Sequence, residues 1–261
     1  IIIISTSSHM PQNRFYCPEK LALGAIVSLP ESATIHAARV LRMTVGDQAI
    51  LFNGDGHDYT CELTLVKKNE VLAKVNASNP INNESPLNIT LLQGISSGDR
   101  MDYTIQKAVE LGVNHIQPVA TERSVVKLNQ ERAAKRLAHW QNVVHSACEQ
   151  SGRAVVPQIA EPKSLSHWLA ENPHQNQCRI LLNPIGAKRL AELEKPIHDT
   201  SHETNHEIQL LIGAEGGLSL NEIEAASTNG FQSIILGPRI LRTETAALAA
   251  MASIHTVWGD F

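Results

Sequence analysis

Three loops in the second half of the chain carry residues that could form a ligand site. Each loop follows an apolar run, and the loops read LLNP at 181–184, IGAEGGLS at 212–219 and LGPRILRTETA at 236–246. The apolar runs are expected to be strands of one open sheet, and ligands of such sheets bind outside the carboxyl ends of the strands. We therefore expect the three loops to converge on a single site.

The second loop is the most informative of the three. Gly213, Gly216 and Gly217 permit backbone conformations and a close approach to a ligand that a Cβ atom would block. Ser219 and Glu222 have capping-box spacing, which predicts the start of a helix whose free N–H groups could face a ligand. A tight strand–helix turn without a ligand explains the same pattern. The chain shows no P-loop, dinucleotide or nucleophile-elbow motif here.

The third loop adds charge to the predicted site. Arg239 and Arg242 precede Glu244, and a guanidinium is suited to binding anions and base edges. A structural cluster of ion pairs is the alternative explanation of these three side chains. Thr243 is placed to cap the final helix, whose small apolar residues at 246–250 would allow close packing, for example against a second subunit.

The composition favours a soluble cytoplasmic protein and suggests no metal site. The four cysteines lie far apart and the twelve histidines show no metal-ligand spacing. No apolar run approaches the roughly 18 residues of a membrane span. Residues 1–9 lack the features of an export signal and are interpreted as cloning residues. The net charge is −4, but residues 100–153 carry eight Lys and Arg against five acidic residues, a local excess that solvated helix faces also explain.

The elements that must position these loops indicate two domains. Residues 10–78 predict a small β-barrel, with a helix at 32–43 that opens on Ser32 and a hairpin turn at 53–56. The polar, proline-bounded stretch 79–86 is interpreted as a linker. From residue 87 to 261 apolar strands alternate with helices, which predicts an α/β fold with a parallel sheet.

In the loops described above and in several further stretches, the chain resembles the RsmE family of ribosomal RNA uridine N3-methyltransferases, within the SPOUT superfamily. The resemblance covers nearly the whole chain from residue 14 onward, apart from Ala214, where the family usually has proline. The matching stretches are HAARVLRM at 36–43, QKAVELGV at 106–113, ERS at 122–124, ACEQSGR at 147–153, the glycine loop and the third loop.

The resemblance implies a PUA-like RNA-binding barrel, a catalytic domain with a deep trefoil knot, and a homodimer. It implies S-adenosyl-L-methionine (SAM) as cofactor and one uridine of 16S rRNA in the small ribosomal subunit as substrate. The residues it places around the cofactor are Leu182, Asn183, Ile212, Gly213, Glu215, Gly216, Gly217, Leu236, Gly237, Leu241, Arg242, Thr243, Thr245 and Ala246.

Methylation at uridine N3 requires loss of the N3 proton and stabilisation of the resulting anion. An arginine aimed at O2 or O4 of the base would provide that stabilisation. The candidate catalytic residues are therefore Arg153 and Arg242, with Glu244 to orient an arginine or accept a proton. For RNA docking, through contacts that should weaken with salt, the candidates are Arg14, His36, Arg39, Arg42, Arg123 and Lys127.

Three other functions compete with this interpretation. Ribose 2′-O-methyltransferases of the same superfamily usually carry a serine–asparagine pair in the last loop, where this chain reads LRTET at 241–245. A non-catalytic RNA-binding protein would not need the glycine loop. A nucleotide-binding oxidoreductase would need the dinucleotide fingerprint.

Overall fold

The computed structural model describes residues 13–124, 130–185, 187–196 and 207–261. By their internal contacts the residues divide into two compact units. Unit 1 comprises Ile1–Asn83 with Cys148–Val156, and unit 2 comprises Glu84–Ala147 with Pro157–Phe261. The expected cloning residues 1–9 lie outside the described residues.

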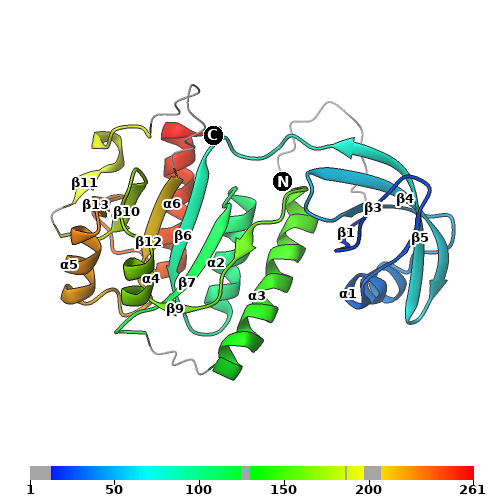
Figure 1. Ribbon diagram of the computed structural model, residues 1–261, viewed down its shortest axis with the longest axis horizontal. Helices are drawn as coiled ribbons and strands as arrows, with labels where there is room; N and C mark the ends of the chain where they lie inside the picture. The colour runs from blue at the N-terminus through cyan, green and yellow to red at the C-terminus, as the bar shows by residue number, and fades with distance from the viewer. Residues whose placement is uncertain (1–12, 125–129, 186, 197–206) are drawn as a thin grey trace. The chain divides into compact units, whose positions relative to one another are not determined.

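A five-stranded sheet forms unit 1 (Figure 1). Its order is β1-β3-β4-β5-β2, with β1 parallel to β3 and the other neighbours antiparallel. The strands are β1 (Arg14–Tyr16), β2 (Ile26–Ser28), β3 (Gln48–Phe52), β4 (His57–Lys67) and β5 (Glu70–Pro80). The predicted hairpin turn at 53–56 is confirmed, because it joins β3 to β4 with Leu51 paired to Tyr59.

Alternation along the strands builds the core of unit 1. In β4 the side chains of Tyr59, Cys61 and Leu63 are buried, and in β5 those of Val71 and Ala73 are buried. Successive side chains of a strand point to opposite faces, so one face of the sheet becomes apolar. Burial of that face is what holds the unit together.

The predicted helix at 32–43 is shorter and less regular than expected. It consists of α1 (Glu31–Ile35) followed by one π-helical turn, η1 (His36–Val40). The residue before α1 is Pro30, and no side chain caps the helix, so Ser32 is not its cap. Arg42 lies beyond the helix with φ +53°, in the left-handed region that non-glycine residues rarely adopt.

The β-sheet of unit 2 is parallel throughout, as predicted (Figure 1). Its order is β11-β13-β10-β12-β6-β7-β8, and β9 also pairs with β7. The strands are β6 (Asn88–Gly94), β7 (His115–Ala120), β8 (Gln158–Ile159), β9 (Lys163–Ser164), β10 (Cys178–Leu182), β11 (Lys188–Arg189), β12 (Glu207–Ile212) and β13 (Gln232–Ile235). Sequence periodicity does not reveal β8, β9 and β11, because two residues show no alternation.

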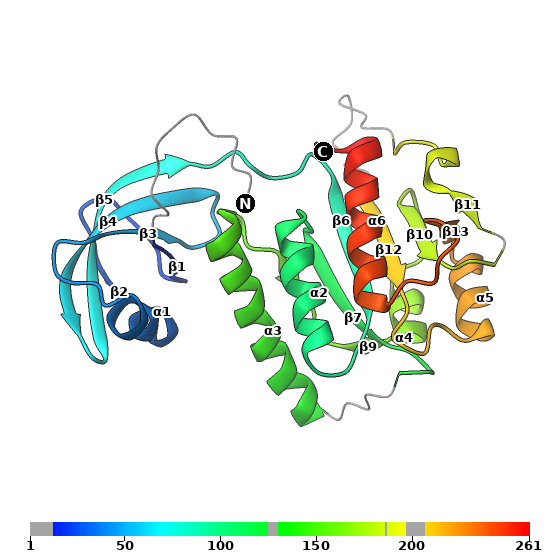
Figure 2. The same ribbon diagram turned by 180° about the vertical axis from the view of Figure 1, so that it is seen from behind.

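Helices cover both faces of this sheet, as Figure 2 shows. They are α2 (Asp99–Glu110), α4 (Leu165–Glu171), α5 (Leu220–Thr228), α6 (Thr243–Trp258) and the short η2 (Leu190–Glu192). The long helix α3 (Gln130–Ser151) contributes its last turn to unit 1. Packing of α2 on α6 and of α4 on α5 leaves the central strands buried on both sides, which is why they read as continuous apolar runs.

None of the helices within the described residues is long and apolar enough to cross a membrane. Among the same residues, no group of three or more histidine, cysteine or acidic side chains is arranged to hold a metal ion.

Candidate active site

The three predicted loops follow strands that are neighbours in the sheet. β10 pairs with β12 on one side and with β13 on the other, and all three strands run parallel. Their carboxyl ends therefore open at the same edge, which is the arrangement that the sequence predicted. The loops surround a cavity of about 730 Å³ that lies wholly within unit 2.

Most of the predicted cofactor residues line this cavity. They are Leu182, Asn183, Ile212, Gly213, Glu215, Gly217, Leu236, Gly237, Leu241, Arg242, Thr243 and Ala246. Gly216 and Thr245 are the two predicted residues that do not. Other residues of the three predicted loops also line it, namely Pro184, Ala214, Leu218, Pro238, Arg239, Ile240 and Glu244. The lining residues outside those loops are Arg100, Arg123, Ile185, Leu220, Ile223, Ile234 and Ile235.

The glycine loop is a tight turn that needs its glycines. The Gly217 N–H donates to the carbonyl of Ala214 at 2.8 Å, and Gly217 has φ +67°. A Cβ on Gly213 would lie 3.0 Å from the backbone of Gly217. The turn closes although position 214 is alanine and not proline. The predicted capping box of Ser219 is confirmed, and α5 begins directly after the turn.

A fourth glycine, on the neighbouring strand β6, was not predicted from the sequence. A Cβ on Gly94 would lie 2.3 Å from the backbone nitrogen of Ala214 and 2.6 Å from the carbonyl carbon of Gly213. The absence of a side chain at Gly94 therefore lets the glycine loop cross the end of β6. A lone glycine at the end of a strand carries no signal of this contact in the sequence.

Thr243 ties the first turn of α6 to the glycine loop. Its Oγ1 donates to the carbonyl of Gly213 at 2.6 Å and accepts from Nε2 of Gln93 at 3.0 Å. The prediction that Thr243 caps α6 is wrong: the residue before the helix is Arg242, which makes no capping hydrogen bond with its side chain. The hydroxyl of Thr243 instead joins β6, α6 and the loop after β12.

Glu215 is held at the edge of the cavity by Arg100, in the first turn of α2, and by Ser97, two residues before that helix. Its Oε1 accepts hydrogen bonds from the backbone N–H of Ser97 at 3.0 Å, from Ser97 Oγ at 3.1 Å and from Arg100 Nη1 at 3.0 Å. Burial raises the pKa of Glu215, but these hydrogen bonds outweigh it and hold the pKa below its ordinary value. The carboxylate is thus charged and already engaged within the protein.

The loop after β7 forms another wall of the site. A Cβ on Gly216 would lie 2.9 Å from both the carbonyl oxygen and the Cβ of Arg123, and Arg123 Nη1 donates to the carbonyl of Gly216 at 3.4 Å. Glu222 accepts from the backbone N–H of Glu122 at 2.9 Å and from that of Ser219. Gly216 therefore serves loop packing, and Arg123, predicted for RNA docking, lines the cavity.

Glu244 contributes an unpaired carboxylate to the cavity lining. Its Oε2 is buried and has no hydrogen-bond partner among the residues that the structure describes. Within the same residues neither Arg239 nor Arg242 forms a salt bridge with it. The alternative of a structural ion-pair cluster in the third loop therefore has no support here.

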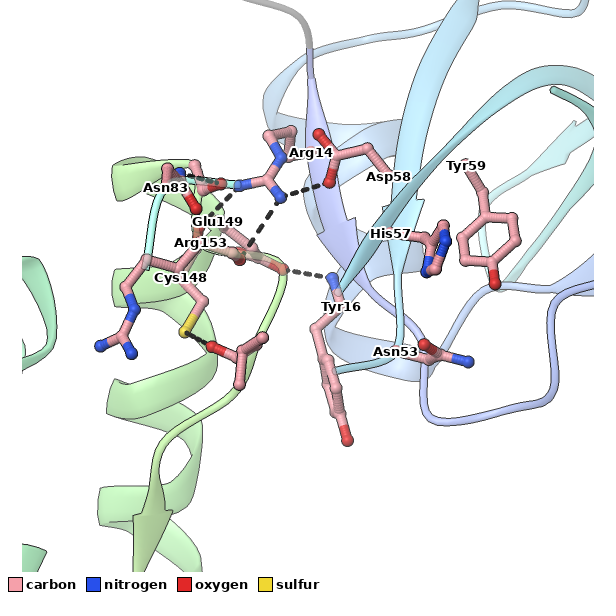
Figure 3. A network of polar contacts seen from close by, with 12 residues as sticks. Arg14, Tyr16, Asn53, His57, Asp58, Tyr59, Asn83, Cys148, Glu149 and Arg153 are labelled. Atoms are coloured by element: carbon pink, nitrogen blue, oxygen red, sulfur yellow. Dashed lines mark hydrogen bonds and ion pairs between the residues drawn. The ribbon is translucent and has the colours of Figure 1, made fainter. Parts of the chain in front are cut away.

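In unit 1, Arg14 is engaged in a buried network rather than exposed to RNA (Figure 3). Its Nη2 forms an ion pair with Asp58 at 2.6 Å, and its Nη1 donates to the carbonyl of Cys148 at 2.8 Å. Nη2 also lies 3.4 Å from the carbonyl of Arg153, and the Tyr16 N–H donates to Glu149 at 2.9 Å. The guanidinium of Arg14 is only slightly exposed, so it is not available to a phosphate.

The other predicted RNA-docking residues differ in their surroundings. His36 and Arg39 are exposed on η1, where Arg39 donates to Asn69 at 3.1 Å. Arg42 is exposed but lies past the end of the helical segment, so it does not share a helix face with Arg39. Lys127 lies outside the described residues.

The predicted catalytic arginines fall in different units. Arg153 belongs to unit 1, in the segment that Arg14 contacts, and Arg242 belongs to unit 2. Arg242 is exposed at the lining of the cavity, whereas Arg153 is buried.

The fold and the cavity are those of an α/β protein with a ligand pocket at the carboxyl edge of its sheet. Comparison with known families shows that the class is that of RNA methyltransferases. The chain matches the RNA methyltransferase domain over residues 83–255 and the RNA methyltransferase PUA domain over residues 29–76. It belongs to the family of ribosomal RNA small subunit methyltransferase E. Relatives of that name include one from Buchnera aphidicola (subsp. Schizaphis graminum), 35% identical over 95% of this chain and 97% of the relative, and one from Bacillus subtilis, 33% identical over 84% and 85%.

Two solved structures are similar to this protein over nearly its whole length. A ribosomal RNA small subunit methyltransferase E from Neisseria gonorrhoeae, bound to SAM, is 44% identical with a TM-score of 0.86. A methyltransferase from Legionella pneumophila in complex with SAM is 37% identical with a TM-score of 0.89. Each comparison covers 96% of this chain and 99% of the other.

Proposed function

We propose that this protein uses SAM to methylate N3 of one uridine in 16S rRNA of the small ribosomal subunit. The observation that carries the proposal is the meeting of three loops, from adjacent parallel strands, around one cavity in a member of this family. The relatives' names supply the ribosomal RNA of the small subunit as substrate class. N3 of uridine as the atom and the single target nucleotide follow from the resemblance of the sequence to the family.

The lining of the cavity suits SAM. Its volume of about 730 Å³ falls in the range of small-molecule pockets. Ile212, Ile234 and Leu241 provide apolar surface, and the turns at 213–217 and 236–237 provide backbone groups. Glu244 adds to the lining a carboxylate without an ion-pair partner among the described residues, which suits a ligand that carries positive charge. When bound, SAM supplies a methyl group that is already electrophilic, because it sits on a sulfonium.

The residues of the chain must position the base and stabilise its anion. The neutral imide nitrogen has no available lone pair, so the N3 proton has to leave. A guanidinium near O2 or O4 would lower the energy of the resulting anion, and correct positioning alone is worth several kcal/mol. Arg242, exposed at the cavity, and Arg153 remain the predicted residues for this role.

The RNA would bind through basic side chains. His36, Arg39, Arg42 and Arg123 are exposed and remain candidates for phosphate contacts. Lys127 also remains a candidate from the sequence and lies outside the described residues. Arg14 is left out of this set, because its guanidinium is engaged by Asp58 and Cys148 within unit 1. The deep trefoil knot, the homodimer and the cytoplasmic location stay predictions from the resemblance and from the ribosomal substrate.

Nucleoside analysis by mass spectrometry tests the proposal. Ribosomal RNA from cells that lack the protein should lose one 3-methyluridine in 16S rRNA, and expression of this chain should restore it. Expression of Arg242→Ala should not restore it, although the variant folds. Appearance of a 2′-O-methylated nucleoside instead would favour the related ribose methyltransferases, and no change in either nucleoside would contradict the proposal.

A further inference from the structure

The charged groups that line the cavity are mostly positive. They are the four guanidinium groups of Arg100, Arg123, Arg239 and Arg242 and the two carboxylates of Glu215 and Glu244. The Glu215 carboxylate is already engaged by Ser97 and Arg100. For a ligand with a positive charge, Glu244 is therefore the lining carboxylate that has no such partner among the described residues.

Glu244 sits where an unpaired negative charge is unusual. It is the second residue of α6, and its Oε2 is buried without a hydrogen-bond partner among the described residues. The N-terminal turn of a helix favours a negative charge, but a buried charged atom without a partner still costs on the order of 1–3 kcal/mol or more. The structure holds Glu244 there through its neighbour Thr243, whose hydroxyl is fixed on Gly213.

SAM carries two positive groups, and they differ in what can stabilise them. The ammonium has N–H donors, which the backbone carbonyls of the three loops can accept. The sulfonium has no N–H or O–H donor and forms no ordinary hydrogen bond as a donor, so a nearby negative charge stabilises it electrostatically. Glu244 meets this requirement, because it lines the cavity and its Oε2, buried just beneath the surface, has no hydrogen-bond partner among the described residues.

We propose that Glu244 balances the positive charge of the SAM sulfonium and so makes the pocket bind SAM in preference to S-adenosylhomocysteine. The inference rests on the proposed function. The two molecules differ by one methyl group and by the charge on sulfur, so a carboxylate directed at that sulfur discriminates between them. Such discrimination would help the product to leave and SAM to replace it.

Isothermal titration calorimetry with SAM and with S-adenosylhomocysteine, on the full chain, tests this role. In Glu244→Gln the side chain keeps its shape and loses its charge, so the Kd for SAM should rise about tenfold while the Kd for S-adenosylhomocysteine changes less than about threefold. Glu244→Asp keeps the charge and should retain part of the preference. Glu224→Gln, which removes an exposed carboxylate from α5 away from the cavity lining, is the matched control.

The possible results separate this inference from the proposed function. An equal loss of affinity for both molecules in Glu244→Gln would place the carboxylate against a group that they share and overturn the inference. Unchanged SAM affinity would overturn it as well. Failure of the wild-type chain to bind SAM at all would instead contradict the proposed function. Thermal unfolding of each variant shows whether it folds, and Glu244→Ala, which also removes the charge, serves if Glu244→Gln does not fold.

Discussion

The hydroxyl of Thr243, at the start of the last helix, donates a hydrogen bond of 2.6 Å to the carbonyl of Gly213, thirty residues earlier in the chain. Both residues line the cavity. Gln93, at the end of β6, donates to the same hydroxyl. Three segments that meet at the carboxyl edge of the sheet are thus joined through one side chain.

Replacing Thr243 by valine should lower both stability and SAM affinity. Valine has nearly the same shape but leaves the carbonyl of Gly213 without this donor, which costs about 1–3 kcal/mol in the free energy of unfolding. Urea denaturation measures the stability and calorimetry the affinity. Thr256→Val, which removes an exposed hydroxyl from the same helix, should change stability by less than about 0.5 kcal/mol. Equal effects of the two substitutions would show that the bond to Gly213 is unimportant.

Gly94→Ala should displace the glycine loop and abolish tight SAM binding. The added Cβ would stand 2.3 Å from the backbone nitrogen of Ala214, so the backbone of the whole loop must shift, because no flexible side chain is there to move aside. Gly24→Ala provides the control, since its Cβ would meet open space and the substitution carries only the strain of φ +80°, about 1–2 kcal/mol. Wild-type SAM affinity in Gly94→Ala would mean that the loop tolerates the shift.

Arg14→Ala should destabilise unit 1 by about 3–5 kcal/mol, because it leaves the buried carboxylate of Asp58 without its partner. The same substitution removes the bond to the carbonyl of Cys148 in the segment that carries Arg153. Denaturation monitored by circular dichroism measures the loss. Arg39→Ala, which removes an exposed arginine with one hydrogen bond to Asn69, should leave stability nearly unchanged. A loss of RNA affinity without any loss of stability in Arg14→Ala would restore its predicted role in docking.

The contribution of Glu215 to stability should depend on pH in a defined direction. Its pKa in the folded protein lies below the ordinary value of 4.5, because hydrogen bonds from Ser97 and Arg100 outweigh its burial. The stabilisation is therefore fully present above about pH 4.5 and is lost as the pH falls through the lower, folded-state value. The difference in unfolding free energy between wild type and Glu215→Gln should be constant near neutrality and shrink in acid. A difference that grows as the pH falls would contradict this.

Much of the site could be predicted from the sequence, because the patterns that mark its turns and helix starts each lie within a few consecutive residues. The glycines at 213–217, the capping box of Ser219 and the apolar runs before each loop identify strand–turn–helix units. Carboxyl ends of neighbouring parallel strands meet at one edge, so the convergence of the three loops follows from the pattern. The match of spaced motifs to one family then indicated the cofactor.

Only the tertiary structure decided which side chains face one another across the sequence. The roles of Gly94, of Thr243 and of the pairing between Arg14 and Asp58 rest on contacts between residues separated by 30 to 150 positions. Such contacts depend on strand order and on helix packing, which residue types and spacing do not encode locally. An arginine reads the same in a sequence whether it meets solvent or a buried carboxylate, and its partner alone determines whether it binds RNA or holds the fold together.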